Sequence, residues 1–211
     1  MRLTKLGHSC VRLEKNGRTL VIDPGGLTPQ PDALHGAEAV LITHEHFDHL
    51  DPDRLHAAAA ANPDLTVHTC PGAARHLTGL GDRLHVVRNG DTFTTAGFTI
   101  TAAGEHHQHN LPDTPPTDNV GFLIDNEVFH PGDAWTTTDA PTVLPALQAP
   151  WATAADLVAY LRRPGVRRAY PVHDGLLNTD GLAVYDRILA GEAQRRGADI
   201  RRLHPGQSVD L

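Results

Sequence analysis

Three histidines and one aspartate, side chains that often bind metal ions, lie within six consecutive residues. They are His44, His46, Asp48 and His49, in the pattern His-x-His-x-Asp-His. Imidazole nitrogens and carboxylate oxygens suit Zn²⁺ and other borderline divalent cations. His44 and His46 share one side of an extended backbone and can converge on one cation, whereas a turn after them can aim Asp48 and His49 at a second. A solvated polar loop would rarely contain four such residues at this spacing, so the segment predicts a metal site.

The elements on either side of this segment should hold it firmly. Residues 39–43 form a continuous apolar run ending in Thr43, which is typical of a strand buried on both faces. Asp51 and Pro52 then predict the start of a helix, with Asp51 as N-cap and Pro52 in the first helical position. The candidate ligands therefore leave a sheet at a strand end and enter a helix.

The rest of the chain repeats one order of elements. The turns at residues 15–18 and 125–127 predict two hairpins, the first with an Asn-Gly turn. Further strands are expected at residues 2–6, 10–14, 19–23, 65–69, 84–87, 98–102, 120–124, 128–130, 143–147, 168–172 and 209–211, and helices at 71–77, 153–163 and 182–196. A β-rich stretch followed by a βα stretch occurs twice, which predicts an α/β fold built as a four-layer αββα sandwich. No long low-complexity linker interrupts the chain, so residues 1–211 are expected to form a single domain.

Composition narrows the classes of function. The chain has 211 residues, of which 40% are hydrophobic and 20% charged, as in a globular protein with a sizeable core. A net charge of -7 argues against a nucleic-acid partner, since phosphate neutralisation needs a basic surface. It leaves a small-molecule substrate open, even an anionic one, because bound divalent cations reverse the local charge. Nothing in the sequence sets the oligomeric state.

The cysteine count and the apolar segments bear on the compartment. The two cysteines, Cys10 and Cys70, indicate no disulfide framework and suit a reducing compartment. The N-terminal residues lack the apolar run of a signal peptide, and no window reaches the roughly 18 apolar residues that span a membrane. We therefore expect a soluble, cytoplasmic protein with no membrane partner.

Five motifs, taken together, resemble one family. The segment 44–49 resembles the HxHxDH signature of the metallo-β-lactamase superfamily, and four further motifs follow the superfamily's order. These are Gly7-His8-Ser9 with residues 20–24, His130-Pro131-Gly132-Asp133, Tyr170-Pro171-Val172-His173, and Val209-Asp210-Leu211. They are similar to the branch of L-ascorbate-6-phosphate lactonase-like and UPF0173-like hydrolases, except that Ala134 stands where the branch usually has Thr. The resemblance covers nearly the whole chain and is specific for fold and metal site, but not for substrate.

The resemblance implies a dinuclear ligand set. One cation would be bound by His44, His46 and a histidine of the 106–109 cluster, the second by Asp48, His49 and His173, with Asp133 bridging the two. If the strand that holds Phe98 continues in phase through Gly104, family spacing favours His107 as the third histidine. His106 is the alternative if the strand ends one residue earlier, and His109 is a further candidate.

The resemblance also implies a reaction. A water or hydroxide between two divalent ions would attack an ester, lactone, amide or phosphodiester of a small molecule, with Asp48 or Asp133 steadying it and accepting its proton. Zinc is the expected metal, with manganese and iron as alternatives. Two other interpretations stay open: a mononuclear iron oxidoreductase similar to the persulfide dioxygenases, which keep HxHxDH, and a non-catalytic metal-binding member of the fold.

Several residues outside the ligand set have expected places. The family equivalent of Asp23 orients the metal loop through hydrogen bonds. His8 is expected at the mouth of the site or as a structural hydrogen-bonding residue, and Trp151 in the pocket or in the core. Residues 111–119 and 135–140 are expected to form loops that set specificity. Cys10 is expected to be buried, and the remaining histidines are expected on the surface: His35, His56, His68, His76, His85 and His204.

Overall fold

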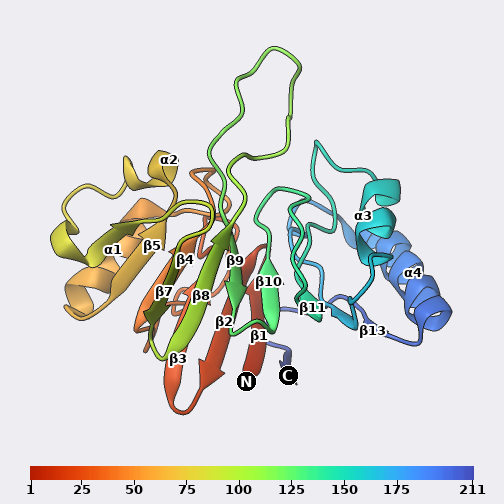
Figure 1. The fold of residues 1–211 in the computed structure, drawn as a ribbon, viewed down its shortest axis with the longest axis horizontal. Coiled ribbons are helices and arrows are strands. Elements are labelled where there is room, and N and C mark those ends of the chain that lie inside the picture. The colour runs from red at the N-terminus through yellow and green to blue at the C-terminus, as the bar shows by residue number, and fades with distance from the viewer.

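Two seven-stranded mixed sheets make up the centre of the fold, and the helices lie on their outer sides (Figure 1). The computed structural model describes residues 1–211. The first sheet has the order β14 (Ser208–Asp210), β1 (Arg2–Gly7), β2 (Cys10–Lys15), β3 (Arg18–Ile22), β4 (Ala39–Ile42), β5 (Thr66–Thr69) and β6 (Leu84–Val86). The second has the order β13 (Asp199–Ile200), β12 (Arg168–Ala169), β11 (Thr142–Val143), β10 (Val128–His130), β9 (Gly121–Ile124), β8 (Phe98–Ala103) and β7 (Thr92–Thr95).

The two sheets share one pattern of strand directions. In the first sheet β14, β1, β2 and β3 pair antiparallel, and β3 to β6 pair parallel. In the second sheet β7 to β10 pair antiparallel, and β10 to β13 pair parallel. The helices α1 (Pro52–Ala61) and α2 (Pro71–Ala74) lie on one side of the molecule, and α3 (Ala154–Leu161) and α4 (Thr179–Arg196) lie on the other (Figure 1). This order of layers confirms the predicted α/β sandwich of αββα type.

Local sequence explains how several elements begin and end. Asn16 and Gly17 have φ of 52° and 76°, so the Asn-Gly pair makes the left-handed turn between β2 and β3. The side chain of Asp51 accepts a hydrogen bond from Arg54 N and begins α1. Thr153 and Asp156 form the predicted capping box at the start of α3. Gly197, with φ of 60°, ends α4.

The predicted strands 143–147 and 168–172 are too long. β11 and β12 have two residues each, because Pro145 and Pro171 carry no backbone N–H for the ladder. An isolated bridge between Ala146 and Val172 continues the pairing. The strands β7 and β13 were not predicted. Both are edge strands, and their residues lack a continuous apolar pattern.

The interior has a large core between the sheets and a smaller one beneath α3 and α4. The large core joins residues of both sheets, among them Leu13, Ile22, Phe98 and Phe122. His68 also lies in the interior, at 7% exposure, and stacks on Phe93 with 4.4 Å between ring centroids. The surface position predicted for His68 is therefore wrong, because β5 is a central strand and this residue faces the opposite sheet. None of the helices combines the length and apolar character that crossing a membrane requires.

Candidate metal centre

The segments that follow β1, β4, β8, β10 and β12 bring histidines and carboxylates together in two groups. Within each group the candidate ligand atoms lie within 4.8 Å of one another. The first group is His44, His46, His107 and Asp133, and the second is His8, Asp48, His49 and His173. All except His46 are buried. Strands from both sheets therefore contribute to one cluster.

Asp133 lies between the two groups. Its Oδ2 is 3.3 Å from His107 Nε2 and 3.2 Å from His173 Nε2, and its Oδ1 is 3.3 Å from His49 Nε2. One carboxylate thus contacts a histidine of the first group and two of the second.

The loop 44–49 is fixed by the segment that follows β3. Asp23 Oδ1 accepts a hydrogen bond from Thr43 N at 2.8 Å, and Asp23 Oδ2 accepts from Thr43 Oγ1 at 2.7 Å and from His49 Nδ1 at 2.8 Å. Gly25 touches the loop so closely that an added Cβ would lie 2.1 Å from the carbonyl carbon of Asp48. Asp23 therefore makes the hydrogen bonds expected of it, and the Gly25 position accepts no side chain.

Hydrogen bonds at one ring nitrogen orient four of the histidines. In each, Nδ1 donates to an oxygen, so Nε2 is the ring nitrogen that faces the cluster and would bind a cation. The pairs are His44 with Thr43 Oγ1 (3.0 Å), His49 with Asp23, His173 with Gln148 O (2.6 Å), and His107 with Gln108 O. His46 differs, because its Nδ1 faces the cluster and lies 3.0 Å from His44 Nε2.

Several atoms at the centre of the cluster lack hydrogen-bond partners. His49 Nε2, His107 Nε2 and Asp133 Oδ1 are buried without one. Buried polar atoms are nearly always paired, so two nitrogens and an oxygen that converge without a hydrogen bond fit a cation placed between them. Nitrogen and carboxylate oxygen together are the donor set of Zn²⁺ and related divalent ions. The residues present therefore fit a metal centre.

His8 has a different role from the other histidines. Gly175 N donates to His8 Nδ1 at 3.0 Å, so Nε2 carries the hydrogen and donates to Asp48 Oδ2 at 3.0 Å. Both ring nitrogens are occupied by these bonds. His8 therefore orients Asp48 and offers no lone pair to a cation.

The negative charges of the carboxylates in the cluster are compensated by neighbouring histidines. Burial raises the pKa of the Asp133 carboxyl, but the neighbouring His49 and His173 outweigh it and hold that pKa well below its usual range. Burial lowers the pKa of His173, but Asp133 and Asp48 outweigh it and raise this pKa to about 9. Burial holds the pKa of His44 well below its usual value. The carboxylates are thus ionised and neutralised by protons on histidines, which a bound cation would displace.

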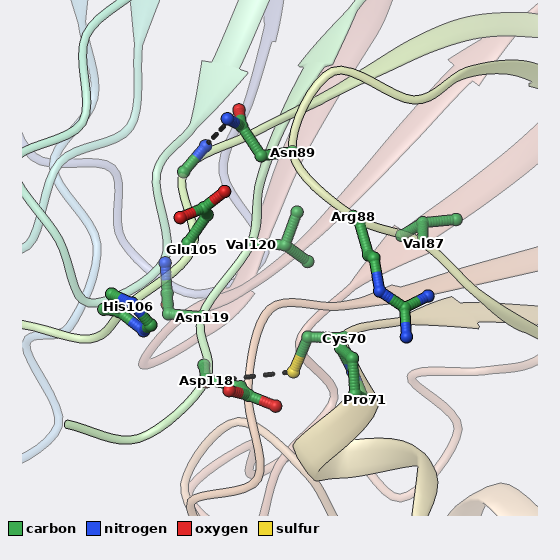
Figure 2. A pocket seen from close by; sticks show the side chains of 11 residues that line it. Cys70, Pro71, Val87, Arg88, Asn89, Glu105, His106, Asp118, Asn119 and Val120 are labelled. Carbon is green, nitrogen blue, oxygen red and sulfur yellow. Dashed lines mark hydrogen bonds between the residues drawn. The ribbon is translucent and has the colours of Figure 1, made fainter. Parts of the chain in front are cut away.

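The structure separates the two candidates for the third histidine of the first group. His107 is buried in the cluster, whereas His106 is exposed. The 105–107 segment runs antiparallel to 117–119, with His106 bridged to Asp118 and His107 N donating to Thr117 O. Figure 2 shows His106 among the side chains around a separate hollow of about 220 Å³, together with Cys70, Arg88 and Asp118. His109 is also exposed and lies near the centre in the long loop between β8 and β9.

Two residues that contact Asp133 are Asn119, for which the sequence made no prediction, and Trp151, which was expected either in the pocket or in the core. Asn119 is buried; its Oδ1 accepts from Asp133 N at 3.0 Å and its Nδ2 donates to Pro131 O at 3.0 Å. No sequence motif marks this residue. Trp151 is half-buried in the pocket rather than in the core, and its Nε1 donates to Asp133 Oδ2 at 3.3 Å. Asn119 therefore fixes the backbone at Asp133, and Trp151 holds its carboxylate.

A hollow of about 240 Å³ opens onto the cluster. The cluster residues that line it are His46, Asp48, His107, Asp133 and His173. Its rim is formed by Phe47, Asn110, Pro150, Trp151 and Leu176. A small molecule can therefore reach both groups of candidate ligands from one side.

Fold and site together define a hydrolase class with the metallo-β-lactamase fold. The sequence model of the Beta-lactamase superfamily domain matches residues 2–147. The chain belongs to this superfamily. Its relatives place it in the branch of the UPF0173 metal-dependent hydrolases.

Two relatives illustrate the sequence similarity. Protein Rv0786c of Mycobacterium tuberculosis is 33% identical over 193 residues, which cover 88% of this chain and 89% of that protein. A UPF0173 metal-dependent hydrolase of Anoxybacillus flavithermus is 34% identical over 153 residues, which cover 66% of each chain.

Solved structures show the same fold. Igni18, a metallo hydrolase from Ignicoccus hospitalis, superposes with a TM-score of 0.75 at 18% identity, covering 99% of this chain and 97% of its own. The metallo-beta-lactamase fold protein YhfI from Bacillus subtilis gives a TM-score of 0.75 at 15% identity and covers 99% and 98%. The likeness therefore spans both sheets and all four helices.

Proposed function

We propose that the chain is a dinuclear metal-dependent hydrolase that cleaves an ester, lactone or phosphodiester bond of a small molecule. His44, His46 and His107 would hold one divalent cation, and Asp48, His49 and His173 the second, with Asp133 shared. The observation that carries this proposal is the place of Asp133, within 3.3 Å of histidine nitrogens from both groups.

The cofactor supplies the activation. Two divalent ions lower the pKa of a bound water from about 16 to near neutrality and polarise the oxygen of the bond under attack. Zinc suits the nitrogen-rich donor set best, and manganese and iron are compatible with it.

The protein's own residues position the reacting groups. Asp23 and Gln148 O fix the rings of His49 and His173, and His8 fixes Asp48. Because the pKa values of Asp48 and Asp133 are held far below the usual range, both stay ionised and accept hydrogen bonds from an attacking water. Either carboxylate would hold the proton of that water only transiently. The bond would be cleaved in the hollow that Trp151 and Leu176 line.

Metal content and turnover test this proposal. Protein purified without a histidine tag should contain two equivalents of zinc or manganese by elemental analysis and should hydrolyse at least one ester, lactone or phosphodiester. Asp133→Ala should lower turnover by more than about 100-fold. The unfolding curve of the metal-free protein should change far less.

A surface carboxylate provides the control. Asp139 is exposed, and Asp139→Ala should leave both metal content and turnover unchanged. Full activity of Asp133→Ala would contradict the proposal. So would a single iron with oxygen consumption, or two bound metals without hydrolysis of any compound tested.

A further inference from the structure

Exposed apolar side chains gather at the mouth of the metal centre. Phe47 is 67% exposed and Leu176 is 55% exposed, and both line the 240 Å³ hollow beside Pro150 and Trp151. Leu111, at 63%, lies in the adjoining loop between β8 and β9. Exposed apolar groups that cluster around a concave site mark a surface that an apolar ligand covers.

No lysine or arginine side chain lines this site. Neither the 240 Å³ hollow nor the adjoining hollow of about 70 Å³ has a lysine or arginine among its lining residues. The smaller hollow is lined by neutral polar groups and prolines, with His109 the only titratable residue outside the cluster. The polar groups are Gln108, Asn110, Thr114 and Thr117. The surroundings of the cluster therefore offer hydrogen bonds and apolar contact, but no fixed positive charge.

The absence of a cation bears on what can bind. Cations in the two ligand groups would compensate negative charge at the reacting bond only. A second anionic group further along the substrate would find no lysine or arginine in the lining of either hollow to pair with. A phosphorylated or carboxylated substrate is thus disfavoured by the walls of the site.

We propose that the substrate is a carboxylic ester or lactone that is uncharged and has a small apolar part. The apolar part packs on Phe47, Trp151 and Leu176, and neutral polar groups face Asn110 and Gln108. This inference rests on the proposed hydrolase function. In the reaction the oxygen of water bonds to the carbonyl carbon, the ester C–O bond breaks, and the leaving oxygen takes up a proton, giving an acid and an alcohol.

A matched pair of substrates tests the inference by activity. p-Nitrophenyl butyrate and p-nitrophenyl hemisuccinate have the same number of acyl carbons and differ by a terminal carboxylate. The metal-loaded enzyme should prefer the butyrate by at least about tenfold in kcat/KM. Leu176→Lys places the missing cation in the rim and should shift this ratio toward the hemisuccinate by about tenfold. Val184→Lys, at an exposed position on α4, should leave the ratio unchanged.

A binding measurement on metal-free protein separates substrate class from catalysis. The nitroaryl amides N-(4-nitrophenyl)butyramide and N-(4-nitrophenyl)succinamic acid quench tryptophan fluorescence on contact. The neutral amide should bind at least about tenfold more tightly. Trp151→Phe should weaken the quenching more than Trp135→Phe does, because Trp151 lines the hollow, whereas Trp135 contacts it only through Trp151 at 5.3 Å between ring centroids.

The outcomes distinguish this inference from the function on which it rests. A wild-type preference for the hemisuccinate, or for bis-p-nitrophenyl phosphate over both esters, overturns the inference and leaves metal-dependent hydrolysis intact. Selective binding of the neutral amide without hydrolysis of any ester supports the inference and overturns the proposed function. Equal binding of the two amides, without hydrolysis, overturns both.

Discussion

Replacing Asp23 by Asn tests how the metal loop is held. Asp23 is fully buried and accepts three hydrogen bonds, from Thr43 N, Thr43 Oγ1 and His49 Nδ1. Its φ is 50°, in the left-handed region, which asparagine adopts as readily as aspartate. Asp23→Asn therefore keeps the backbone and the volume, and changes only the charge and one acceptor atom.

The structure sets the expected size of the effect. The amide oxygen can still accept from Thr43 N, but the NH₂ group then faces Thr43 Oγ1 and His49 Nδ1. To avoid opposing two donors, His49 must move its hydrogen to Nε2, which faces Asp133. His49 then offers no lone pair to a cation. We expect a 10- to 100-fold loss of zinc affinity, about 1.4–2.7 kcal/mol, as for other groups that orient a metal ligand.

Competition with a fluorescent zinc chelator measures this affinity directly. Asp125→Asn is the matched control, because Asp125 has φ of 51° and accepts a backbone hydrogen bond from Thr99 N, but lies in the hairpin between β9 and β10. The control should bind zinc as the wild type does. If Asp23→Asn also keeps wild-type affinity, then the carboxylate does not set the tautomer of His49 and the reasoning is refuted.

Three further substitutions have defined outcomes. His107→Ala should lower the metal content by about one equivalent in elemental analysis, whereas His106→Ala should leave it unchanged; the opposite result would reverse their assignment. His68→Phe should raise the free energy of unfolding of the metal-free protein by about 1 kcal/mol at pH 7, because neither buried ring nitrogen has a partner. Burial and the neighbouring His85 lower the pKa of His68 to about 4. The unfolded chain, with an ordinary pKa of about 6.5, therefore binds the extra proton between these values. Wild-type stability should fall by about 2 kcal/mol as the pH drops through this window, and His68→Phe should lose this part of the acid sensitivity in urea unfolding at pH 7 and pH 4.5. The exposed control His35→Phe should show neither change. Lys5→Met should cost about 3 kcal/mol in the same unfolding assay, because it leaves the carboxylate of Asp174 without its buried partner at 3.0 Å; an unchanged midpoint would show that Arg202, at 3.7 Å, compensates fully.

The fold could be predicted because local signals and the order of elements agree. The Asn-Gly turn, the Asp51-Pro52 helix start and the capping box at Thr153 each appear in the structure at the predicted residues. The lengths of β11 and β12 were predicted wrongly, because the apolar pattern was followed through Pro145 and Pro171, which interrupt the ladder. Edge strands such as β7 have one partner only, so their sequence carries little of the apolar pattern that marks a buried strand.

The candidate site was predictable where ligands follow one another in the chain and less so elsewhere. The segment 44–49 is recognisable from the spacing of its histidines and aspartate. The direction in which His107 points depends instead on the phase of the chain after β8, which Gly104 changes with its φ of 90°. Asn119 and Trp151 contact Asp133 only through folding and have no motif. Lys5 shares the buried face of β1 with Leu3, so alternation places it inside, but its partner Asp174 lies 169 residues away.

The distribution of the candidate ligands between the sheets has a consequence for the stability of the whole molecule. His44, His46, Asp48 and His49 extend from the first sheet, whereas His107, Asp133 and His173 extend from the second. Cations held by both sets would act as cross-links between the two halves of the sandwich, in addition to the shared apolar core and the backbone hydrogen bonds from Val120 N to Thr43 O and from His173 N to His8 O. Metal supply would then govern the rigidity of the chain as well as its chemistry, since any ligand that binds only the folded state shifts the folding equilibrium toward it.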